Sequence, residues 1–293
     1  MPTNRIRLMQ WGWAALMLIV CGGCAGQQSA VAPRTRSDEV LAVLPPGVRD
    51  AGNTYSSVIA LTRKGDNRPY CSGVLIHPRL VLTAAHCVCR NSRWDGSNKI
   101  RDLNSCLKQA FIQTAMYSSA GQNKPDDFKA YEGDVLPHPE FKIVLKVIDG
   151  QDKIVSANAD LAVIRLRSEV AQAVSPAPLH SDEISKDANI AVTGFGVDQV
   201  DDKGQCVYRD AILTRRFGNN TVSDTGEAGQ VFQIADQSQT LAACGDSGGG
   251  SFRDNKLVGI LSSVSVGGTS TYTSTYYYKE WIAKMITEIA PVR

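Results

Sequence analysis

"CGDSGGGSF", residues 244–252, places four glycines around one acid and one serine, and apolar Phe252 ends the stretch. Glycine adopts positive φ without steric cost, so a segment of this kind is typical of a sharp turn. Two interpretations are open at this point. Ser247 is either a nucleophile held in a tight loop or part of a glycine-rich turn between two strands.

Short apolar segments of strand length recur through the rest of the chain. They are rich in β-branched residues, bounded by Gly, Pro, Asn or Asp, and not separated by regular amphipathic helices. The segments are 56–61, 72–76, 80–85, 141–147, 161–166, 190–196 and 257–266. They predict antiparallel β structure in barrels or sandwiches. A single helix is expected at the end, where Trp281, Met285 and Ile289 recur at every fourth position.

Composition and charge exclude several classes of fold and partner. The chain has 293 residues, and 43% hydrophobic content is ample for a packed core. A net charge of +2, from 31 basic and 29 acidic side chains without a long basic run, argues against nucleic acid as a partner. No repeat of about 20 to 50 residues and no heptad pattern is present, which argues against solenoids and coiled coils.

The N-terminus has the layout of a secretory signal. Arg5 and Arg7 precede an apolar stretch of about 15 residues, which is too short to span a bilayer comfortably. We expect residues 1–24 to be a signal peptide, the alternative being a retained anchor helix. "CGGC" resembles the lipobox of bacterial lipoproteins and predicts lipidation and membrane tethering at Cys24, whereas ordinary cleavage would follow Ala25. The expected location is the periplasm or outer membrane as a lipoprotein, or outside the cell after secretion.

Changes in composition divide the remaining chain. Residues 25–47 are polar and rich in Pro, Ser and Ala, which predicts a linker or pro-segment. The stretch 168–188 is the best candidate for a connection between two halves. We therefore expect an N-terminal unit at 48–175 and a C-terminal unit at 176–293.

Cysteine usage agrees with export. Outside the signal region the cysteines are Cys71, Cys87, Cys89, Cys106, Cys206 and Cys244. An even number in an oxidising compartment predicts up to three disulfides. "CVC" near His86 raises a metal site as the alternative, but its spacing is not that of a zinc finger or ribbon, so no metal is expected. Few strand signals lie between Cys89 and Tyr131, which predicts an inserted surface loop that a Cys89–Cys106 disulfide could staple.

Three local patterns occur in an order that suits nucleophilic acyl transfer. "LTAAHC" ends a predicted strand near His86, "DLAVIRL" opens one with Asp160, and "GDSGG" presents Ser247. A serine hydroxyl is inert near neutral pH until an imidazole removes its proton, and the imidazole needs an acceptor that fixes its tautomer. These residues are far apart in sequence, so only a tertiary fold can bring them together.

With these motifs the chain resembles the chymotrypsin- and trypsin-like serine proteases. The resemblance covers roughly residues 48–290 and rests on "CSGVLI", "TAAHC", "HPEF", "DLAVIRL", "VTGFG", "CGDSGG" and a closing "EWI". It implies an all-β fold of two packed antiparallel six-stranded β-barrels with a C-terminal α-helix. It also implies a serine endopeptidase that cleaves protein or peptide substrates without a cofactor, and we expect a monomer. An α/β-hydrolase is excluded, because no histidine follows Ser247.

The resemblance assigns roles to single residues. His86 would be the general base, Asp160 its orienting partner and Ser247 the nucleophile. The backbone N–H groups of Gly245 and Ser247 would form the oxyanion hole. In the family, the acid at position 246 pairs with an apolar N-terminus that proteolysis exposes.

This chain departs from that activation pattern. It lacks the usual "IVGG" start, and the nearest candidate terminus, Val48, is followed by Arg49 and Asp50 instead of glycines. A local turn cap is therefore the alternative role for Asp246. The same departure keeps open a catalytically silent member of the family that acts as a binding or regulatory module.

The resemblance also bears on which cysteines form disulfides. The resemblance implies a disulfide between Cys71 and Cys87 that braces the loop of the histidine. Cys206 and Cys244 are a further candidate pair, which would tie a surface loop to the rim of the site. Free thiols are the alternative for these two.

Specificity is inferred from two segments. Trypsin-like members carry an acid six residues before the nucleophile, where this chain has Leu241, so an ion pair with a basic substrate residue is missing. Ser262, Ser263 and Val264 match the segment that pairs with the substrate backbone and walls the pocket. A valine there would narrow the entrance, as in elastase-like relatives. We therefore expect cleavage after small or medium uncharged residues.

Overall fold

The computed structural model describes residues 47–122, 124–148, 150–197, 213–236, 238–265 and 268–289. All elements below belong to the unit Ser37–Arg293. The expected signal peptide, Cys24, nearly all of the expected linker and Cys206 lie outside the described residues, so what the sequence says of them stays a prediction.

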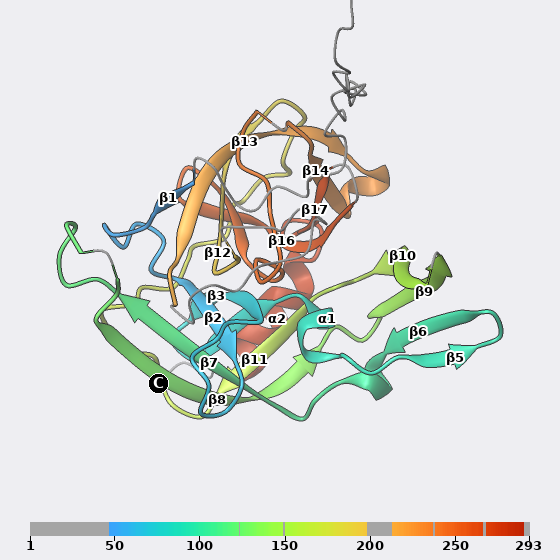
Figure 1. Cartoon of the computed structure of the whole chain (residues 1–293), viewed down its shortest axis with the longest axis horizontal. Helices are drawn as coiled ribbons and strands as arrows, with labels where there is room; N and C mark the ends of the chain where they lie inside the picture. The colour runs from blue at the N-terminus through green and yellow to red at the C-terminus, as the bar shows by residue number, and fades with distance from the viewer. Residues whose placement is uncertain are drawn as a thin grey trace, which may run out of the picture. The chain divides into compact units, whose positions relative to one another are not determined.

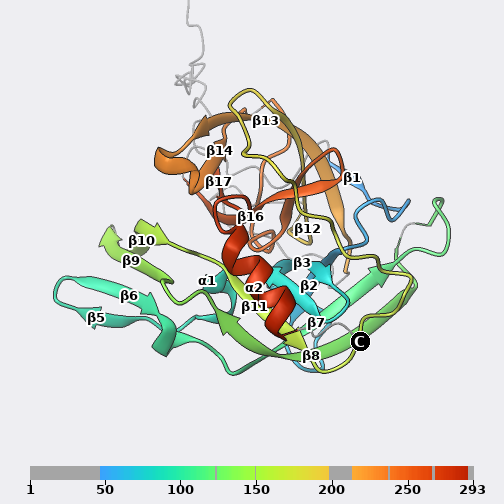
Figure 2. The same cartoon turned by 180° about the vertical axis from the view of Figure 1, so that it is seen from behind.

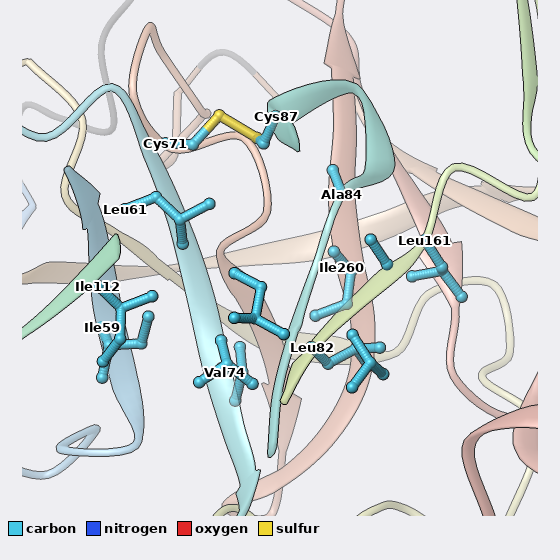
Figure 3. Packing of buried hydrophobic residues seen from close by; sticks show 14 of the residues in the cluster. Ile59, Leu61, Cys71, Val74, Leu82, Ala84, Cys87, Ile112, Leu161 and Ile260 are labelled. Atoms are coloured by element: carbon cyan, nitrogen blue, oxygen red, sulfur yellow. A yellow bond between two sulfur atoms is a disulfide. The ribbon is translucent and has the colours of Figure 1, made fainter. Parts of the chain in front are cut away.

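The first half of the described chain forms a closed antiparallel barrel of six strands in the order β11-β4-β3-β2-β7-β8. Its strands are β2 (Val58–Thr62), β3 (Cys71–His77), β4 (Leu80–Thr83), β7 (Gln109–Met116), β8 (Asp127–Pro137) and β11 (Ala162–Leu166). All residues of β2 and β4 are buried, as expected for short, nearly continuous apolar runs. Figure 3 shows Ile59, Leu61, Val74, Leu82 and Ile112 within this core.

The second half forms another six-stranded antiparallel barrel, in the order β13-β12-β15-β16-β17-β14, which pairing of β13 with β14 closes. Its strands are β12 (Asn189–Gly194), β13 (Arg216–Thr225), β14 (Val231–Ile234), β15 (Gly250–Arg253), β16 (Lys256–Val264) and β17 (Ser270–Ser274). A short strand, β1 (Val48–Arg49), adds to β13. Inside the barrel, the rings of Phe232 and Tyr272 stack with centroids 5.3 Å apart. Two six-stranded barrels confirm the expected fold class (Figure 1).

The described residues contain few helical elements. They are α1 (Ala85–Val88), α2 (Lys279–Ile289) and two 3-10 turns, η1 (Leu103–Ser105) and η2 (Glu227–Gly229). The helix expected at the end of the chain is present as α2, and Ile282 on it is fully buried. The Trp281 ring lies 4.8 Å from the ring of His138, which follows β8 of the first barrel. The chain therefore returns from the second barrel to pack on the first (Figure 2).

A separate antiparallel sheet of four strands, which we call the accessory sheet, extends from the first barrel (Figures 1 and 2). Its strands run in the order β10-β9-β6-β5 and are β5 (Arg93–Asp95), β6 (Asn98–Asp102), β9 (Lys142–Ile148) and β10 (Gln151–Asn158). It joins two hairpins that are distant in sequence, because β6 pairs with β9. One hairpin follows α1, and the other ends just before Asp160.

The segment between Cys89 and Tyr131 is not the surface loop that we expected, although its Cys89–Cys106 disulfide is present. This segment holds β5, β6 and the barrel strand β7, and the start of β8. In β7, "QAFIQTAM", polar and apolar residues are mixed, so a search for continuous apolar runs overlooks it. In β5 and β6, cross-strand pairing and ion pairs such as Arg93–Asp102, with N···O 2.7 Å, replace apolar burial. The segment 141–147 is a strand as expected, but β9 belongs to the accessory sheet and not to a barrel.

A buried ion pair joins the two barrels. Arg215, directly before β13, is fully buried, and its Nε donates to Oδ2 of buried Asp50 over 2.7 Å. Its NH1 group donates to the carbonyl oxygens of Val58 and Ala115, both in strands of the first barrel. A guanidinium from the second barrel is therefore satisfied inside the first, which fixes their relative placement.

Candidate active site

The histidine lies where the chain leaves the first barrel. Strand β4 ends at Thr83, whose Oγ1 donates to the carbonyl oxygen of Ser72 over 2.7 Å, and α1 then begins with Ala85. His86 therefore occupies the first turn after the strand, where its side chain is 17% exposed. The next residue, Cys87, forms a disulfide with Cys71 across a Cα–Cα distance of 6.1 Å, which braces this turn against β3 (Figure 3).

Asp160 meets His86 through strand pairing. It lies two residues before the start of β11, which pairs with β4 so that Ala162 lies opposite Thr83. Asp160 Oδ1 accepts a hydrogen bond from the backbone N–H of His86 over 2.8 Å, and Oδ2 lies 2.7 Å from His86 Nδ1. The two contacts hold the imidazole in one orientation.

The electrostatics of this pair determine the tautomer. Burial works to raise the pKa of Asp160, but the charge of His86 and hydrogen bonds from His86 and Ser262 outweigh it and hold the pKa below its usual value. An ionised carboxylate can only accept, so Nδ1 of His86 carries a proton toward Asp160. Nε2 of the neutral ring is then free to take a proton from another group.

Ser262 links this pair to the second barrel. Its hydroxyl, on β16, donates to Asp160 Oδ2 over 2.7 Å, and the residue is 5% exposed. The sequence suggested only a substrate contact for Ser262. The structure directs its side chain to Asp160, so a substrate contact from Ser262 would involve its backbone. No local motif signals this bond, because it joins residues of different barrels.

The loop of Ser247 is clamped between the two barrels. Its carbonyl oxygen accepts from the N–H of Ser72 over 2.7 Å, and Gly248 N–H donates to Leu261 O over 2.8 Å. Gly248 has φ +83°, and a Cβ there would lie 2.2 Å from the carbonyl oxygen of Ser72, so only glycine fits. The buried Ser72 hydroxyl also donates to Gly245 O over 2.8 Å. Ser72 is thus a supporting residue that motif matching missed, although a serine inside an apolar strand is a signal of required polar partners.

The loop lies beside His86. The carbonyl oxygen of Ser247 is 3.5 Å from Cys87 Sγ, and His86 Nε2 is 3.8 Å from the same sulfur. Within the described part of the chain, the Ser247 hydroxyl makes no hydrogen bond to His86. Such bonds are commonly long without substrate and shorten when it binds.

Two backbone N–H groups in the loop of Ser247 stay unpaired within the part of the chain that the structure describes. The N–H groups of Asp246, Gly248 and Gly249 all donate to carbonyl oxygens of the protein. Those of Gly245 and Ser247 have no acceptor among the described residues, and Gly245 has φ +96°. These are the two groups that the sequence analysis assigned to the oxyanion hole. Unpaired donors beside a serine are suited to an oxygen that becomes negatively charged.

Asp246 is buried beneath this loop. Its Oδ1 accepts from Gly196 N–H over 2.7 Å and its Oδ2 from Ala243 N–H over 2.9 Å. Burial raises the pKa of Asp246 to about 7, against the opposing effect of these hydrogen bonds. Val48, the candidate terminus, lies in β1 opposite Phe217 and is 56% exposed in the intact chain.

The residues assigned to specificity fall in two places. Leu241 is buried in the apolar core of the second barrel with Tyr272, and Val264 packs against the same cluster. Ser263 lines a groove next to Asp160. The region of Leu241 is thus apolar.

The remaining cysteines complete the frame of the site. Cys89 and Cys106 form a disulfide at the base of the accessory sheet. Cys244 is disulfide-bonded as well. Over the described ranges, no helix is long and apolar enough to cross a membrane.

Comparison with known proteins identifies the family. A family model described as Trypsin matches residues 47–282. Kallikrein 1-related peptidase b27 of Mus musculus is 24% identical over 74% of this chain and 80% of its own length. Trypsin of Phaedon cochleariae is 24% identical over 73% and 77%. The solved structure of neuropsin, a serine protease expressed in the limbic system of mouse brain, shares the fold with a TM-score of 0.59 and 18% identity, over 82% of this chain and 98% of that one. The chain therefore belongs to the trypsin family and is a serine-type endopeptidase that acts on protein or peptide substrates.

Proposed function

We propose that this chain is an exported endopeptidase that uses His86, Asp160 and Ser247 as a catalytic triad. The observation that carries the proposal is the pair of free N–H groups at Gly245 and Ser247, which lie beside a histidine whose tautomer Asp160 fixes. A silent binding module would have no need to keep two backbone donors unpaired next to a serine.

The geometry supports a two-step reaction. Ser247 Oγ attacks the scissile carbonyl carbon while its proton passes to His86 Nε2, and the resulting oxyanion accepts from the two free N–H groups. His86, now a cation held by Asp160, gives the proton to the leaving amine, and the peptide C–N bond breaks. Water then gives a proton to His86 and attacks the acyl-enzyme, which releases the carboxylic acid product and restores Ser247.

Asp246 supports the loop on which this reaction depends. Its two carboxylate oxygens are bonded to backbone N–H groups of Gly196 and Ala243 in the intact chain. Gly194 and Gly196 both approach the carboxylate so closely that a Cβ would collide with it. We propose that this carboxylate holds the turn of Gly245 in the conformation that leaves the two N–H groups free.

Specificity and location are part of the proposal. Buried, apolar Leu241 and partly buried Val264 favour small or medium uncharged residues before the scissile bond. The disulfides are typical of an oxidising compartment. With the signal-like N-terminus they favour export, with either a lipid on Cys24 or release as a soluble monomer. Mass spectrometry of the mature N-terminus distinguishes the two, because a diacylglyceryl group on Cys24 has a defined added mass.

The test of the activity is covalent labelling. A fluorophosphonate probe should modify Ser247 in the folded, disulfide-bonded protein, and Ser247→Ala should abolish both labelling and turnover, with a rate loss of about 10⁶-fold. Ser118→Ala, an exposed serine far along the chain from the site, is the matched control and should label as the wild type does. Absence of labelling in folded protein, before and after limited proteolysis, would favour the silent binding module.

A further inference from the structure

Ser72 is a fully buried serine inside β3, a strand that is otherwise mostly apolar. A hydroxyl in such a place costs free energy unless it is hydrogen-bonded. Both partners of the Ser72 hydroxyl come from the second half of the chain. It accepts from the backbone N–H of Phe195 over 3.0 Å and donates to the carbonyl oxygen of Gly245 over 2.8 Å. The hydroxyl therefore joins two segments of the second barrel from the side of the first.

The bond to Gly245 acts on one particular peptide unit. The carbonyl of Gly245 and the N–H of Asp246 form the peptide unit that lies between the two units carrying the unpaired N–H groups of Gly245 and Ser247. A peptide unit is planar, so a bond that fixes its carbonyl also fixes its N–H. That N–H donates to Ala243 O over 3.1 Å, on the other side of the unit. The unit is thus held at both ends.

Without the hydroxyl, this peptide unit could rotate at low cost. Gly245 has φ +96°, and a glycine reaches many other backbone conformations without steric penalty. Rotation of the unit would change its orientation relative to its two neighbours, and with it the directions of the N–H groups of Gly245 and Ser247. Ser72 therefore bears on the geometry of the proposed oxyanion hole without touching the position of the oxyanion.

The loop has this conformation while the chain is intact at Val48. Val48 lies opposite Phe217, which in turn lies opposite Thr193 of β12. Two strand spacings, roughly 10 Å, thus separate Val48 from the strand after which Asp246 is bonded to Gly196. An ion pair needs a nitrogen–oxygen distance of about 4 Å or less. An amino group created at Val48 would therefore reach Asp246 only after leaving its pairing with β13.

We propose that Ser72 is a positioning residue whose hydroxyl holds the loop 244–248 in its working conformation in the uncleaved chain, so that this protease needs no new N-terminus at Val48. The inference rests on the proposed function, in which the N–H groups of Gly245 and Ser247 bind the oxyanion. Asp246 supports the loop from within the second barrel, and Ser72 supports it from the first.

The first test is Ser72→Ala, which removes the hydroxyl and keeps the backbone bond to Ser247. Loss of a whole oxyanion donor costs about 10²- to 10³-fold in kcat, so a loop that is misdirected part of the time should cost about tenfold to a hundredfold. KM should change by less than about twofold, because the bound substrate does not depend on these donors as the transition state does. A peptide boronic acid, which forms a tetrahedral adduct with serine, should bind more weakly by about the same factor as kcat falls.

Thr114→Val is the matched control. Thr114 is 2% exposed in the first barrel, and its hydroxyl donates to the carbonyl oxygen of Lys129 over 3.4 Å. Its loss should leave kcat, KM and boronic acid affinity unchanged. Wild-type kcat in Ser72→Ala would refute the role of Ser72. If Ser72→Ala does not fold, hydrogen exchange of the wild type decides. The Phe195 N–H should exchange as slowly as the amides inside β12, and rapid exchange would refute the bond to Ser72.

The second test concerns the uncleaved chain. The fluorophosphonate should label Ser247 in wild-type protein in which mass spectrometry finds residues 47 and 48 still joined. Labelling that appears only after a cut before Val48 would refute the inference and leave the triad standing. Absence of labelling both before and after such a cut would refute the proposed function itself.

Discussion

Replacement of Ser262 by Ala tests how the second barrel supports a histidine–acid pair that belongs to the first. The Ser262 hydroxyl is one of three donors to the buried carboxylate of Asp160, at 2.7 Å from Oδ2. A hydrogen bond to a charged group contributes about 1.5–3 kcal/mol, so its loss should raise the pKa of Asp160. His86 still donates twice, so Asp160 stays ionised at neutral pH.

Ser262→Ala should raise the activation free energy by less than it destabilises the ionised carboxylate of Asp160. Only the part of the interaction that strengthens as His86 becomes a cation lowers the barrier. We expect kcat/KM to fall about threefold to thirtyfold at pH 8, equivalent to about 0.7–2 kcal/mol. Asp160→Asn, which removes the acceptor for Nδ1 altogether, should reduce the rate by about 10⁴-fold.

The pH dependence of stability separates this role from simple packing. The folded pKa of Asp160 is below its unfolded value, so its contribution is present above the unfolded pKa and is lost as pH falls through the folded pKa. Urea unfolding should show Ser262→Ala less stable than the wild type by about 1.5–3 kcal/mol at pH 7. The difference should shrink at a pH low enough to protonate the carboxylate.

Ser251→Ala is the control for this variant. Ser251 is also fully buried in the second barrel, but its hydroxyl donates to the neutral carbonyl of Gly259 over 3.3 Å. Its loss should cost about 1 kcal/mol at every pH and leave kcat/KM unchanged. The reasoning fails if Ser262→Ala matches the wild type in kcat/KM and stability. It also fails if the stability loss of Ser262→Ala is as independent of pH as that of Ser251→Ala.

Two further predictions concern the packing around the site. Arg215→Met leaves buried Asp50 without its cation and should lower the free energy of unfolding in urea by about 3–5 kcal/mol. The double variant Asp50→Asn with Arg215→Met should recover part of this loss. A loss below about 1 kcal/mol for Arg215→Met would contradict the role of the ion pair. His138 packs against the rings of Tyr278 and Trp281, and Glu140 is the nearby acid. Burial lowers the pKa of His138 below its unfolded value. The stability that neutral His138 contributes should therefore be lost as pH falls below the unfolded pKa. His138→Phe should remove this part of the acid sensitivity, and an unchanged pH profile of the unfolding midpoint would refute it.

Sequence motifs predicted the candidate triad because each motif lies in one short segment. "TAAHC", "DLAVIRL" and "GDSGG" are local, and their order carries the family resemblance that implied both the fold class and the triad. The bonds that position these segments are not local. Ser72 and Ser262 reach partners more than 100 residues away, so no spacing pattern reveals them. They follow only from the pairing of strands and the contact between barrels.

The accessory sheet was missed for a different reason. Apart from β9, which its apolar run predicted as a strand, its strands are mostly polar and bury little, and the sheet depends on pairing between two hairpins separated in the sequence. Hydrophobic periodicity detects strands that bury one face, which β5 and most of β10 do not do. Ile154 and Val155, two of the apolar residues that the sheet leaves exposed, line a groove with Ser263 of the second barrel, a contact that no local pattern reveals.

The site depends on the contact between barrels more than on either barrel alone. The first barrel holds His86 and Asp160 through the pairing of β4 with β11, and the second supplies Ser247. Ser72 of the first barrel donates its N–H to Ser247 O and its hydroxyl to Gly245 O, so the loop that we propose to hold the oxyanion is bonded to the barrel that carries the proposed base. Under the proposed roles, a shift between barrels would move the nucleophile Ser247 and the oxyanion donors together, and would separate both from His86. The buried Arg215–Asp50 ion pair and helix α2 fix that interface. This agrees with the narrow range of distances that proton transfer requires.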